Sequence, residues 1–330
     1  MKILSGIQPS GCLHLGNYLG AIKQQIELQA QGEQVTYFIA DLHALTVLQE
    51  PKKLANQILS VAAMYLALGL DPARSTLFLQ SSRPEHCELQ WILLTLTNLG
   101  ELERMTQFKE KGRGIDRARV NVGLFAYPTL MAADILLYQT EEVPVGEDQV
   151  QHIELTRDLA KRFNSRFGET FTLPKPRLID ETKRILGLDD PANKMSKSAI
   201  STYNYIALTD TADTVRQKIR KAVTDSGNEI EFSDDKQALK NLLTIFAGVT
   251  DRTIETIVAE YTGKGYAEFK ESLANEINKF LAPVQARYDK LIADEQYLAQ
   301  ILKDGTERVQ PVAAQTLKTV KEQIGLITLE

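Results

Sequence analysis

The stretch Gln8-Pro9-Ser10-Gly11-Cys12-Leu13-His14-Leu15-Gly16-Asn17 decides the fold of this chain. It follows the apolar pair Ile3-Leu4 and opens a helix whose apolar positions recur at steps of about four, three and four residues, namely Leu15, Leu19, Ile22 and Ile26. Open α/β sheets bind ligands at the carboxyl ends of their strands, and helix N-termini attract phosphate groups. The stretch therefore predicts a nucleotide-binding turn, although a plain turn with a capping histidine explains His14 equally well.

The same alternation of strand and helix signals continues along the first half of the chain. Residues 35–40 and 75–79 are short apolar runs typical of strands, and a helix between them begins at Pro51 and ends before Gly69. Another strand over residues 143–146 leads into a helix that begins near Asp148. This rhythm predicts an α/β fold, a Rossmann-like doubly wound parallel sheet, over residues 1–200.

Helical periodicity replaces the strand signals after about residue 202. One stripe recurs at helical spacing and consists of Tyr266, Phe269, Leu273, Ile277 and Phe280. We therefore expect residues 201–330 to form a C-terminal all-helical domain.

Composition narrows the class of protein. The chain has 330 residues, of which 43% are hydrophobic, and a net charge of -5, which argues against a sequence-blind nucleic-acid binder with a broad basic surface. The N-terminus has no secretory signal pattern, and no apolar run reaches the roughly 18 residues of a membrane span. Two cysteines suggest a reduced cytoplasmic setting, and the four histidines lack zinc-ligand spacing, so we expect no protein-bound metal.

A second candidate motif is Asn193-Lys194-Met195-Ser196-Lys197-Ser198. Two lysines flank a short loop with two hydroxyl groups, and the loop lacks apolar periodicity. Such a loop can hold a pyrophosphate while negative charge redistributes between phosphate groups. A solvated basic turn is the alternative interpretation.

Asp134 is the only charged residue in the apolar helical segment 130–138. Because burial of an unpaired carboxylate is costly, Asp134 needs a partner. It either bonds to neighbouring basic or backbone groups or faces a ligand pocket, and the residues alone leave both possibilities open.

His-x-Gly-Asn and Lys-Met-Ser-Lys-Ser, about 180 residues apart, are the paired signature of class I aminoacyl-tRNA synthetases. The chain resembles the bacterial-type tryptophanyl-tRNA synthetases within that class over nearly its whole length. The segments that carry this resemblance are residues 4–21, 100–111, 127–138, 143–160 and 222–226. The stretch Gly146-Glu147-Asp148-Gln149, followed by residues 152–157, is especially specific.

The resemblance implies activation of L-tryptophan with ATP, then transfer of the tryptophanyl group to the 3′ end of a cognate tRNA. It implies that His14, Asn17, Lys194 and Lys197 are catalytic, with Mg²⁺ held mainly by phosphates and water. The implied ATP-binding residues are Gln8, Pro9, Ser10, Gly16, Asn17, Gly146, Glu147, Asp148, Ile185, Lys194, Met195, Ser196, Lys197 and Ser198. The implied tryptophan-binding residues are Asp134, which would accept the indole N–H, and Ser5, Gly6, Gln8, His43, Met131, Val145 and Gln149. For His43, a buried structural histidine is equally compatible with the sequence.

The resemblance also implies macromolecular partners. Residues 100–138 would form a helical insertion at a homodimer interface, and the helical domain would read the anticodon. Six basic residues lie in one run that would meet the acceptor stem: Arg104, Lys109, Lys111, Arg113, Arg117 and Arg119. A second basic cluster consists of Arg216, Lys218, Arg220 and Lys221. Clusters of this kind are candidates for phosphate contact.

Three other functions compete with this interpretation. A tyrosyl-tRNA synthetase shares the architecture, and only family detail favours tryptophan. A non-catalytic RNA-binding paralogue is disfavoured because both signature motifs are intact. A small-molecule adenylyltransferase is disfavoured by the helical C-terminal part.

Overall fold

The computed structural model describes residues 2–106, 121–178, 185–197, 199–225 and 227–327. Its sheet has five parallel strands in the order β3-β2-β1-β4-β5, which are β1 (Lys2–Ile7), β2 (Gln34–Ile39), β3 (Thr76–Leu79), β4 (Glu142–Val145) and β5 (Lys175–Leu178). The predicted Rossmann-like sheet is confirmed. The strand β5, with the polar sequence Lys-Pro-Arg-Leu, carries no hydrophobic pattern that would have predicted it.

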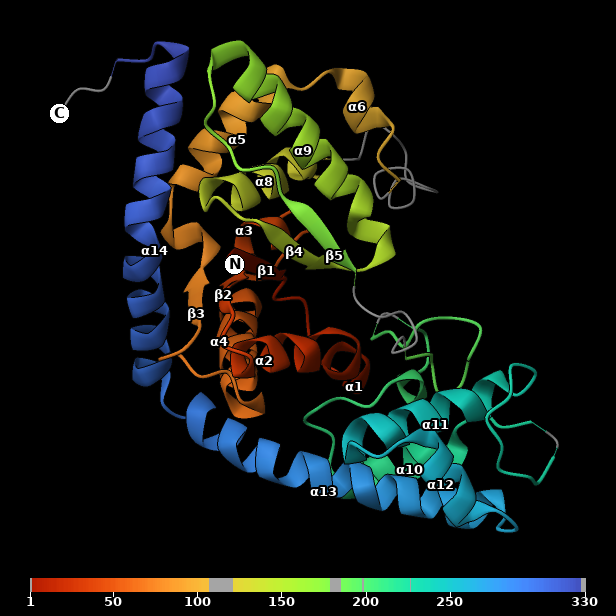
Figure 1. The fold of residues 1–330 in the computed structure, drawn as a ribbon. Coiled ribbons are helices and arrows are strands. Elements are labelled where there is room, and N and C mark those ends of the chain that lie inside the picture. The colour runs from red at the N-terminus through yellow and green to blue at the C-terminus, as the bar shows by residue number, and fades with distance from the viewer. Residues whose placement is uncertain (1, 107–120, 179–184, 198, 226, 328–330) are drawn as a thin grey trace.

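Helices cover both faces of the sheet (Figure 1). On one face, α4 (Pro51–Leu68) packs against Ile3 and Ile7 of β1. On the other face, α5 (Glu85–Leu96), α8 (Val122–Leu137) and α9 (Glu147–Phe167) bury a core that includes Leu4. Side chains alternate between the two faces of a strand, so Ser5 shares the α4 face and Gly6 shares the α8 face.

The first helix is divided where the sequence predicted a continuous one. Its parts are α1 (Leu15–Asn17), a π-helical turn η1 (Tyr18–Ile22) and α2 (Lys23–Ala30). Single π-helical turns within helices are frequent at functional sites. Four short elements lie at other loops or ends: α3 (Asp41–Ala44), η2 (Gln80–Ser82), α6 (Leu99–Glu103) and η5 (Thr202–Asn204).

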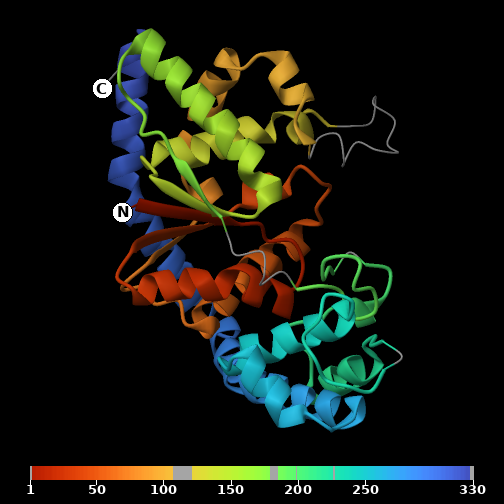
Figure 2. The same ribbon diagram turned by 45° about the vertical axis from the view of Figure 1, so that its right-hand side comes forward.

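The helical part packs against the first helix (Figure 2). It contains α10 (Ala212–Lys221), α11 (Gln237–Thr250), α12 (Ile254–Tyr261) and α13 (Tyr266–Ile292). Phe269, Leu273 and Ile277 of the predicted stripe are buried in the same apolar cluster as Leu15 and Leu19. The stripe therefore joins the helical part to the residues that follow the turn after β1.

The last helix, α14 (Glu295–Ile324), returns to the sheet and runs beside β3 (Figure 1). A Cβ atom at Gly305 would lie 1.9 Å from the Leu77 carbonyl oxygen, so only glycine permits this approach. Val309, Ala313 and other α14 side chains belong to the core beneath α5 and α8. The helix α14 therefore lies against the sheet, although it falls within the predicted helical region of residues 201–330.

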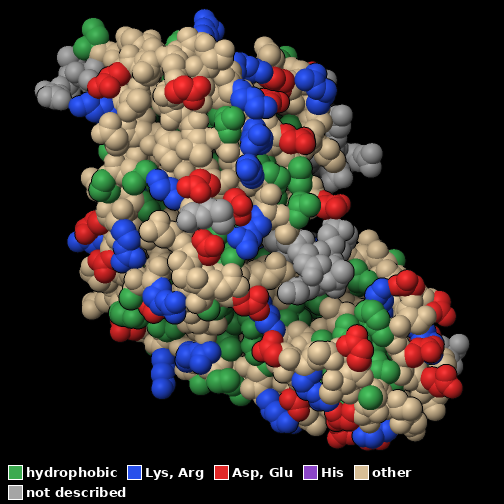
Figure 3. Space-filling model, in the orientation of Figure 1, with side chains coloured by type: hydrophobic (Ala, Val, Ile, Leu, Met, Phe, Trp, Pro, Cys, Tyr) green, Lys and Arg blue, Asp and Glu red, His purple; other side chains and the backbone are tan. Residues whose placement is uncertain are grey.

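Charged side chains of both signs are spread over the face drawn in Figure 3, and Lys and Arg side chains form a short column on its upper half. This distribution agrees with the small net charge and limits any phosphate-binding surface there to a local patch. Within the described part of the chain, no helix is both long and apolar enough to cross a membrane.

Candidate active site

The turn after β1 is held against the segment that enters the helical part. The Leu15 amide donates to the Ile206 carbonyl at 2.8 Å, and the Leu208 amide donates to the Leu13 carbonyl at 3.0 Å. Within the turn, the Ser10 amide donates to the Gln8 carbonyl at 2.8 Å. These backbone bonds fix the position of the turn at the carboxyl end of β1.

The Lys-Met-Ser-Lys loop lies on this turn. The Lys197 ammonium donates to the Ser10 hydroxyl at 3.1 Å. A Cβ atom at Gly16 would lie 3.2 Å from the Met195 sulfur, so the glycine allows Met195 to pack closely on the helix start. The two motifs that the sequence places about 180 residues apart are therefore in direct contact, whereas Ser198 lies outside the described residues.

Hydrogen bonds from the chain on either side fix the backbone of this loop. The Met195 amide donates to the Ile185 carbonyl at 3.0 Å, and the Ser196 amide donates to the Asn204 side-chain oxygen at 2.8 Å. Met195 and Ile185 are both buried, whereas Lys194 is exposed. The loop therefore presents Lys194 to solvent and Lys197 to the turn after β1, from an anchored backbone.

His14 is a buried neutral imidazole. Burial, together with the positive charges of Lys197 and Lys194, lowers its pKa to about 4. Its Nδ1 atom has no hydrogen-bond partner among the described residues. An unpaired polar atom beside two lysines suits a phosphate oxygen, to which the imidazole can donate a hydrogen bond without carrying charge.

The side chain of Asn17 stabilises the start of α1. Its amide oxygen accepts a hydrogen bond from the His14 backbone amide at 3.0 Å, at the start of α1. The oxygen is therefore used to cap the helix, and the NH₂ group is the half of the side chain that can donate to a ligand.

The stretch Gly146-Glu147-Asp148 begins α9 directly after β4. Since β4 pairs with β1, this helix N-terminus and the turn after β1 lie at the same edge of the sheet. Glu147 and Asp148 are exposed in the first turn of the helix. Their positions are compatible with the predicted contribution to ATP binding.

Asp134 lies on α8 and is completely buried. Its Oδ2 atom is 2.8 Å from Nε2 of His43, and its Oδ1 atom accepts hydrogen bonds from Gln80 Nε2 at 2.8 Å and His86 Nδ1 at 2.6 Å. Burial alone would raise the pKa of Asp134, but the charge and hydrogen bond of His43 and the hydrogen bond of His86 hold it below its usual range. The carboxylate is thus ionised and oriented by neighbouring side chains. Asp134 therefore has the basic partners that the first of the two sequence interpretations requires.

The other predicted tryptophan-binding residues divide between the two faces of the sheet. Gly6 is exposed on the Asp134 face, and a Cβ atom there would lie 2.6 Å from the Phe38 ring. The Gln8 amide donates to the His43 carbonyl at 3.3 Å, which brings these two residues together. Met131 and Val145 belong to the core on this face, and Gln149 donates to Asp148 at 2.7 Å.

Ser5 lies on the other face of the sheet. Its hydroxyl oxygen accepts a hydrogen bond from Gln25 of α2 at 2.8 Å, and the side chain is buried on the opposite face from Asp134. The alternation of side chains along β1 explains this orientation. The Ser5 side chain therefore faces away from Asp134.

The family described as tRNA synthetases class I (W and Y) matches residues 1–282 of the chain. A tryptophan–tRNA ligase of Caldanaerobacter subterraneus subsp. tengcongensis is 49% identical over 327 residues, which cover 99% of this chain and 98% of the relative. This chain belongs to the tryptophan–tRNA ligase family.

Solved structures of the tryptophan–tRNA ligase family share the whole fold. The tryptophanyl-tRNA synthetase of Mycoplasma pneumoniae has a TM-score of 0.88 at 38% identity and covers 99% of this chain and 98% of its own. The Campylobacter jejuni enzyme, solved with ADP and tryptophan, has a TM-score of 0.86 at 38% identity, with 99% and 100% covered. The similarity includes the returning helix α14, because it extends over both chains almost completely.

The two basic clusters that the sequence suggested differ in how far the structure describes them and in how exposed their residues are. Except for Arg104, the residues of the first run lie outside the described residues. In the second cluster, Lys218 is buried, bonds to Asp210 at 2.6 Å and lies over the Tyr205 ring, so it cannot contact an RNA phosphate. Arg216, Arg220 and Lys221 remain exposed on α10.

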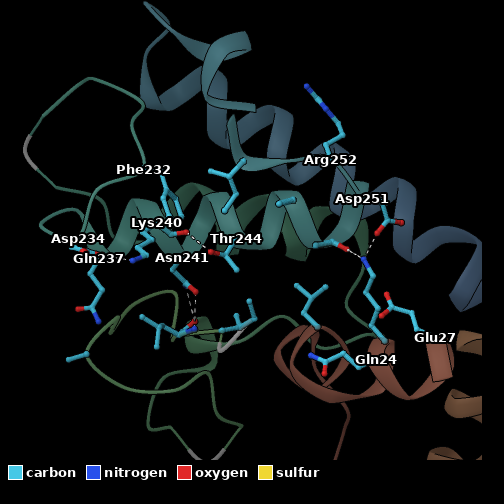
Figure 4. A pocket seen from close by; sticks show the side chains of 18 residues that line it. Gln24, Glu27, Phe232, Asp234, Gln237, Lys240, Asn241, Thr244, Asp251 and Arg252 are labelled. Carbon is cyan, nitrogen blue, oxygen red and sulfur yellow. Dashed lines mark hydrogen bonds and ion pairs between the residues drawn. The ribbon is translucent and has the colours of Figure 1, made fainter. Parts of the chain in front are cut away.

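A cavity of about 950 Å³ separates α2 from α11 in this tryptophan–tRNA ligase family member (Figure 4). At one end, the Lys23 ammonium donates to the Gly248 carbonyl at 2.7 Å and pairs with Asp251. On the α11 side, Asn241 exchanges two hydrogen bonds with the Leu186 backbone, at 2.8 and 3.0 Å. Of the predicted site residues that the structure describes, Ile185 alone lines this cavity, and no residue of the turn after β1 does so.

Several residues around the site had no signal in the sequence. Gln80 and His86 approach Asp134 from the segment after β3, and Asn204 and Asn241 hold the backbone near Met195. Gln57 of α4 can bracket the turn, with its amide nitrogen 3.0 Å from the Pro9 carbonyl and its amide oxygen 3.0 Å from the Gly11 amide. These contacts join distant parts of the chain, so spacing along one sequence does not disclose them.

Proposed function

We propose that this chain activates L-tryptophan with ATP and transfers the tryptophanyl group to the 3′ end of its cognate tRNA. The observation that carries the proposal is the contact between the two signature motifs, with Lys197 on Ser10 and Met195 on Gly16, beside a neutral His14. Family membership, with relatives about half identical over their full length, supports the choice of substrates.

In the first step, a tryptophan carboxylate oxygen attacks the α-phosphorus of ATP. A new oxygen–phosphorus bond forms, the bond to the β-phosphate bridge breaks, and pyrophosphate leaves with the bonding electron pair. The proposed contributions are donors from His14 and the Asn17 NH₂ group and positive charge from Lys194 and Lys197. Positioning and electrostatic stabilisation are sufficient, and no side chain needs to form a covalent intermediate.

Magnesium would neutralise the negative charge of the ATP phosphates. Mg²⁺ keeps much of its water shell and binds through substrate phosphates in sites of this kind. No cluster of three His, Cys, Asp or Glu side chains that could hold a metal was found among the described residues. We propose that the ion arrives with ATP and is held chiefly by phosphates and water.

In the proposed tryptophan pocket, the carboxylate of Asp134 accepts the indole N–H. Gly6, Met131 and Val145 supply space and apolar surface on the same face of the sheet. Phenylalanine has no N–H, so it would leave one acceptor direction of this buried carboxylate without a donor, at a cost of about 1.5–3 kcal/mol for a hydrogen bond to a charged group. His43 would border the ring, since it bonds to Asp134 and is partly exposed.

In the second step, the 2′-hydroxyl of the terminal adenosine attacks the tryptophanyl carbonyl carbon and AMP leaves. We propose that the basic run from Arg104 to Arg119 meets the acceptor stem and that the helical part reads the anticodon. We also propose a homodimer that works in the cytoplasm. An apolar surface formed by Leu45, Val47, Leu48 and Val122 supports the dimer, and the bond from Asn121 to the Thr46 carbonyl at 2.8 Å joins its two segments.

Amino-acid-dependent pyrophosphate exchange with each of the twenty amino acids tests this proposal. We expect exchange with tryptophan alone, at a kcat/KM at least a hundredfold above that for tyrosine. Exchange that prefers tyrosine would support the rival synthetase. Absence of exchange with all twenty, by a folded protein that still binds tRNA, would favour the RNA-binding paralogue.

A further inference from the structure

The two carboxylate oxygen atoms of Asp134 accept different numbers of hydrogen bonds. Oδ1 accepts two hydrogen bonds, from Gln80 at 2.8 Å and His86 at 2.6 Å, whereas Oδ2 has His43 alone, at 2.8 Å. A carboxylate oxygen has about two lone-pair directions. Among the described contacts, Oδ2 is therefore the atom with an acceptor direction still open to a ligand.

His86 holds the saturated side of this carboxylate. It is completely buried, its Nδ1 faces Asp134, and its Nε2 lies 2.7 Å from the Tyr138 hydroxyl. Its ring also packs on Phe78, with ring centroids 6.1 Å apart and nearly parallel planes. With contacts on both nitrogens and on its face, the imidazole has one orientation.

The hydrogen-bond roles in this network follow from the acceptor at its end. An ionised carboxylate only accepts, so Nδ1 of His86 carries the proton. With the proton on Nδ1 alone, Nε2 accepts from the Tyr138 hydroxyl. Burial raises the pKa of Tyr138, and the negative charges of Asp134 and Glu85 add to this effect, so the hydroxyl keeps the proton that it donates.

The geometry of α8 makes this arrangement rigid. Asp134 lies within the helix and Tyr138 is its C-terminal cap residue, four positions later. Residues four apart on a helix lie on one face, so His86 of α5 bridges two side chains of the same face. The bridge fixes the carboxylate relative to the helix axis.

We propose that His86, held by Tyr138, is a positioning residue that fixes Asp134 so that its Oδ2 atom faces the indole N–H. The proposal rests on the proposed function, because it assigns a role in recognising tryptophan. His86 lies behind Asp134 and does not itself contact the substrate. Its effect is therefore on discrimination between indole and an isosteric ring without the N–H.

Two substitutions of His86 separate positioning from packing. In His86→Asn, the NH₂ group stands near the place of Nδ1 and keeps a donor to Asp134, whereas His86→Leu removes the donor and keeps an apolar side chain. We measure kcat/KM of pyrophosphate exchange for tryptophan and for its benzothiophene analogue, which lacks the N–H. We expect His86→Leu to lower the ratio of the two values about tenfold, and His86→Asn to retain it within about threefold.

Tyr138→Phe and a packing control complete the experiment. Tyr138→Phe removes only the hydroxyl and should lower the ratio at least threefold, and it decides the question if His86→Leu does not fold. Phe163→Leu makes a cavity in the same core, where the ring packs on Phe167 and Phe171, and should lower stability while the ratio stays unchanged. Thermal melts accompany each variant.

A ratio that stays at the wild-type value in His86→Leu, or in Tyr138→Phe, overturns the proposal, because both substrates would then suffer together. The proposal is supported if the ratio of kcat/KM for tryptophan to that for the analogue falls in His86→Leu and stays near the wild-type value in His86→Asn. Failure of the proposed function has a different signature, since the wild-type protein would show no tryptophan-dependent exchange.

Discussion

The ammonium nitrogen of Lys197 lies 3.1 Å from the hydroxyl oxygen of Ser10, although the two residues are 187 positions apart. Burial lowers the pKa of Lys197, which means that its charge is partly removed from water. A charge in a less polar setting acts more strongly on a phosphate than an exposed one. An ATP phosphate oxygen can replace Ser10 as the partner, so the loop is prepared for the migrating negative charge.

Replacement of either loop lysine should slow adenylation far more than it weakens tryptophan binding. Lys194→Ala and Lys197→Ala remove charge that is needed most when pyrophosphate leaves, so we expect at least a tenfold loss of kcat and of kcat/KM, or about 1.4 kcal/mol of barrier. Single-turnover adenylation and equilibrium dialysis with tryptophan measure the two effects. Lys52→Ala, on the exposed start of α4, is the control, and a rate within twofold of wild type in both loop variants would refute the assigned role.

A comparison of two glycines with positive φ distinguishes the effect of backbone strain from the effect of a contact with Lys197. Gly11 and Gly32 have φ values of +70° and +83°, and a Cβ atom would lie 3.2 Å from Lys197 at Gly11 but have open space at Gly32. Alanine at either position costs about 1–2 kcal/mol of stability through the left-handed backbone. Only Gly11→Ala should displace Lys197 and slow adenylation, and equal rates in the two variants would contradict the contact.

The depressed pKa of His14 predicts a specific pH dependence of stability. Between pH 6.5 and about 4, the unfolded chain binds a proton at this residue that the folded chain does not. The free energy of unfolding therefore falls as pH drops through this window and levels off below it. In urea denaturation at pH 7 and 4.5, His14→Asn should lose less stability than wild type, by on the order of 2 kcal/mol. Identical losses in the two proteins would mean that His14 titrates normally.

The apolar surface at Leu48 and Val122 predicts the oligomeric state. Leu48 is 100% exposed and Val122 is 76% exposed, which is unfavourable unless a partner covers them. We expect a dimer by light scattering at micromolar concentration, and a monomer after Leu48→Lys with Val122→Lys. Ile327→Lys, at an equally exposed apolar residue in the C-terminal tail, should leave the dimer intact. A monomeric wild-type protein would exclude the proposed interface.

Local signals in the sequence predicted the parts of the fold that local chemistry determines. Pro51 occupies the first turn of α4 and Gly69 ends it at a φ of +115°, as the two residue types favour. The same holds for the turn after β1, whose glycines permit close contact. The packing of α14 on β3 was not predictable, because it depends on a glycine and a carbonyl group more than two hundred residues apart.

The candidate site was predictable as a set of residues but not as a set of orientations. Ser5 faces away from Asp134 because the pleat of β1 turns alternate side chains to opposite faces. Lys218 belongs to a basic cluster in the sequence but pairs with Asp210 and lies over the Tyr205 ring. The partners of Asp134 come from other segments of the chain, so a single sequence gave no indication of His86.

The most direct test of the account is whether variants of Asp134 lose more activity with tryptophan than with an analogue that lacks the indole N–H. In Asp134→Asn, the amide oxygen must face the donors Gln80 and His86, so the NH₂ group faces the indole N–H, which cannot accept. His43 can adapt by moving its own proton, but the indole cannot. The measurement is kcat/KM of pyrophosphate exchange for tryptophan and for its benzothiophene analogue, with thermal melts, in wild type, Asp134→Asn and Asp134→Ala. The account predicts that both variants lose at least tenfold more activity with tryptophan than with the analogue, whereas equal losses together with a large drop in melting temperature would show that Asp134 only holds the fold.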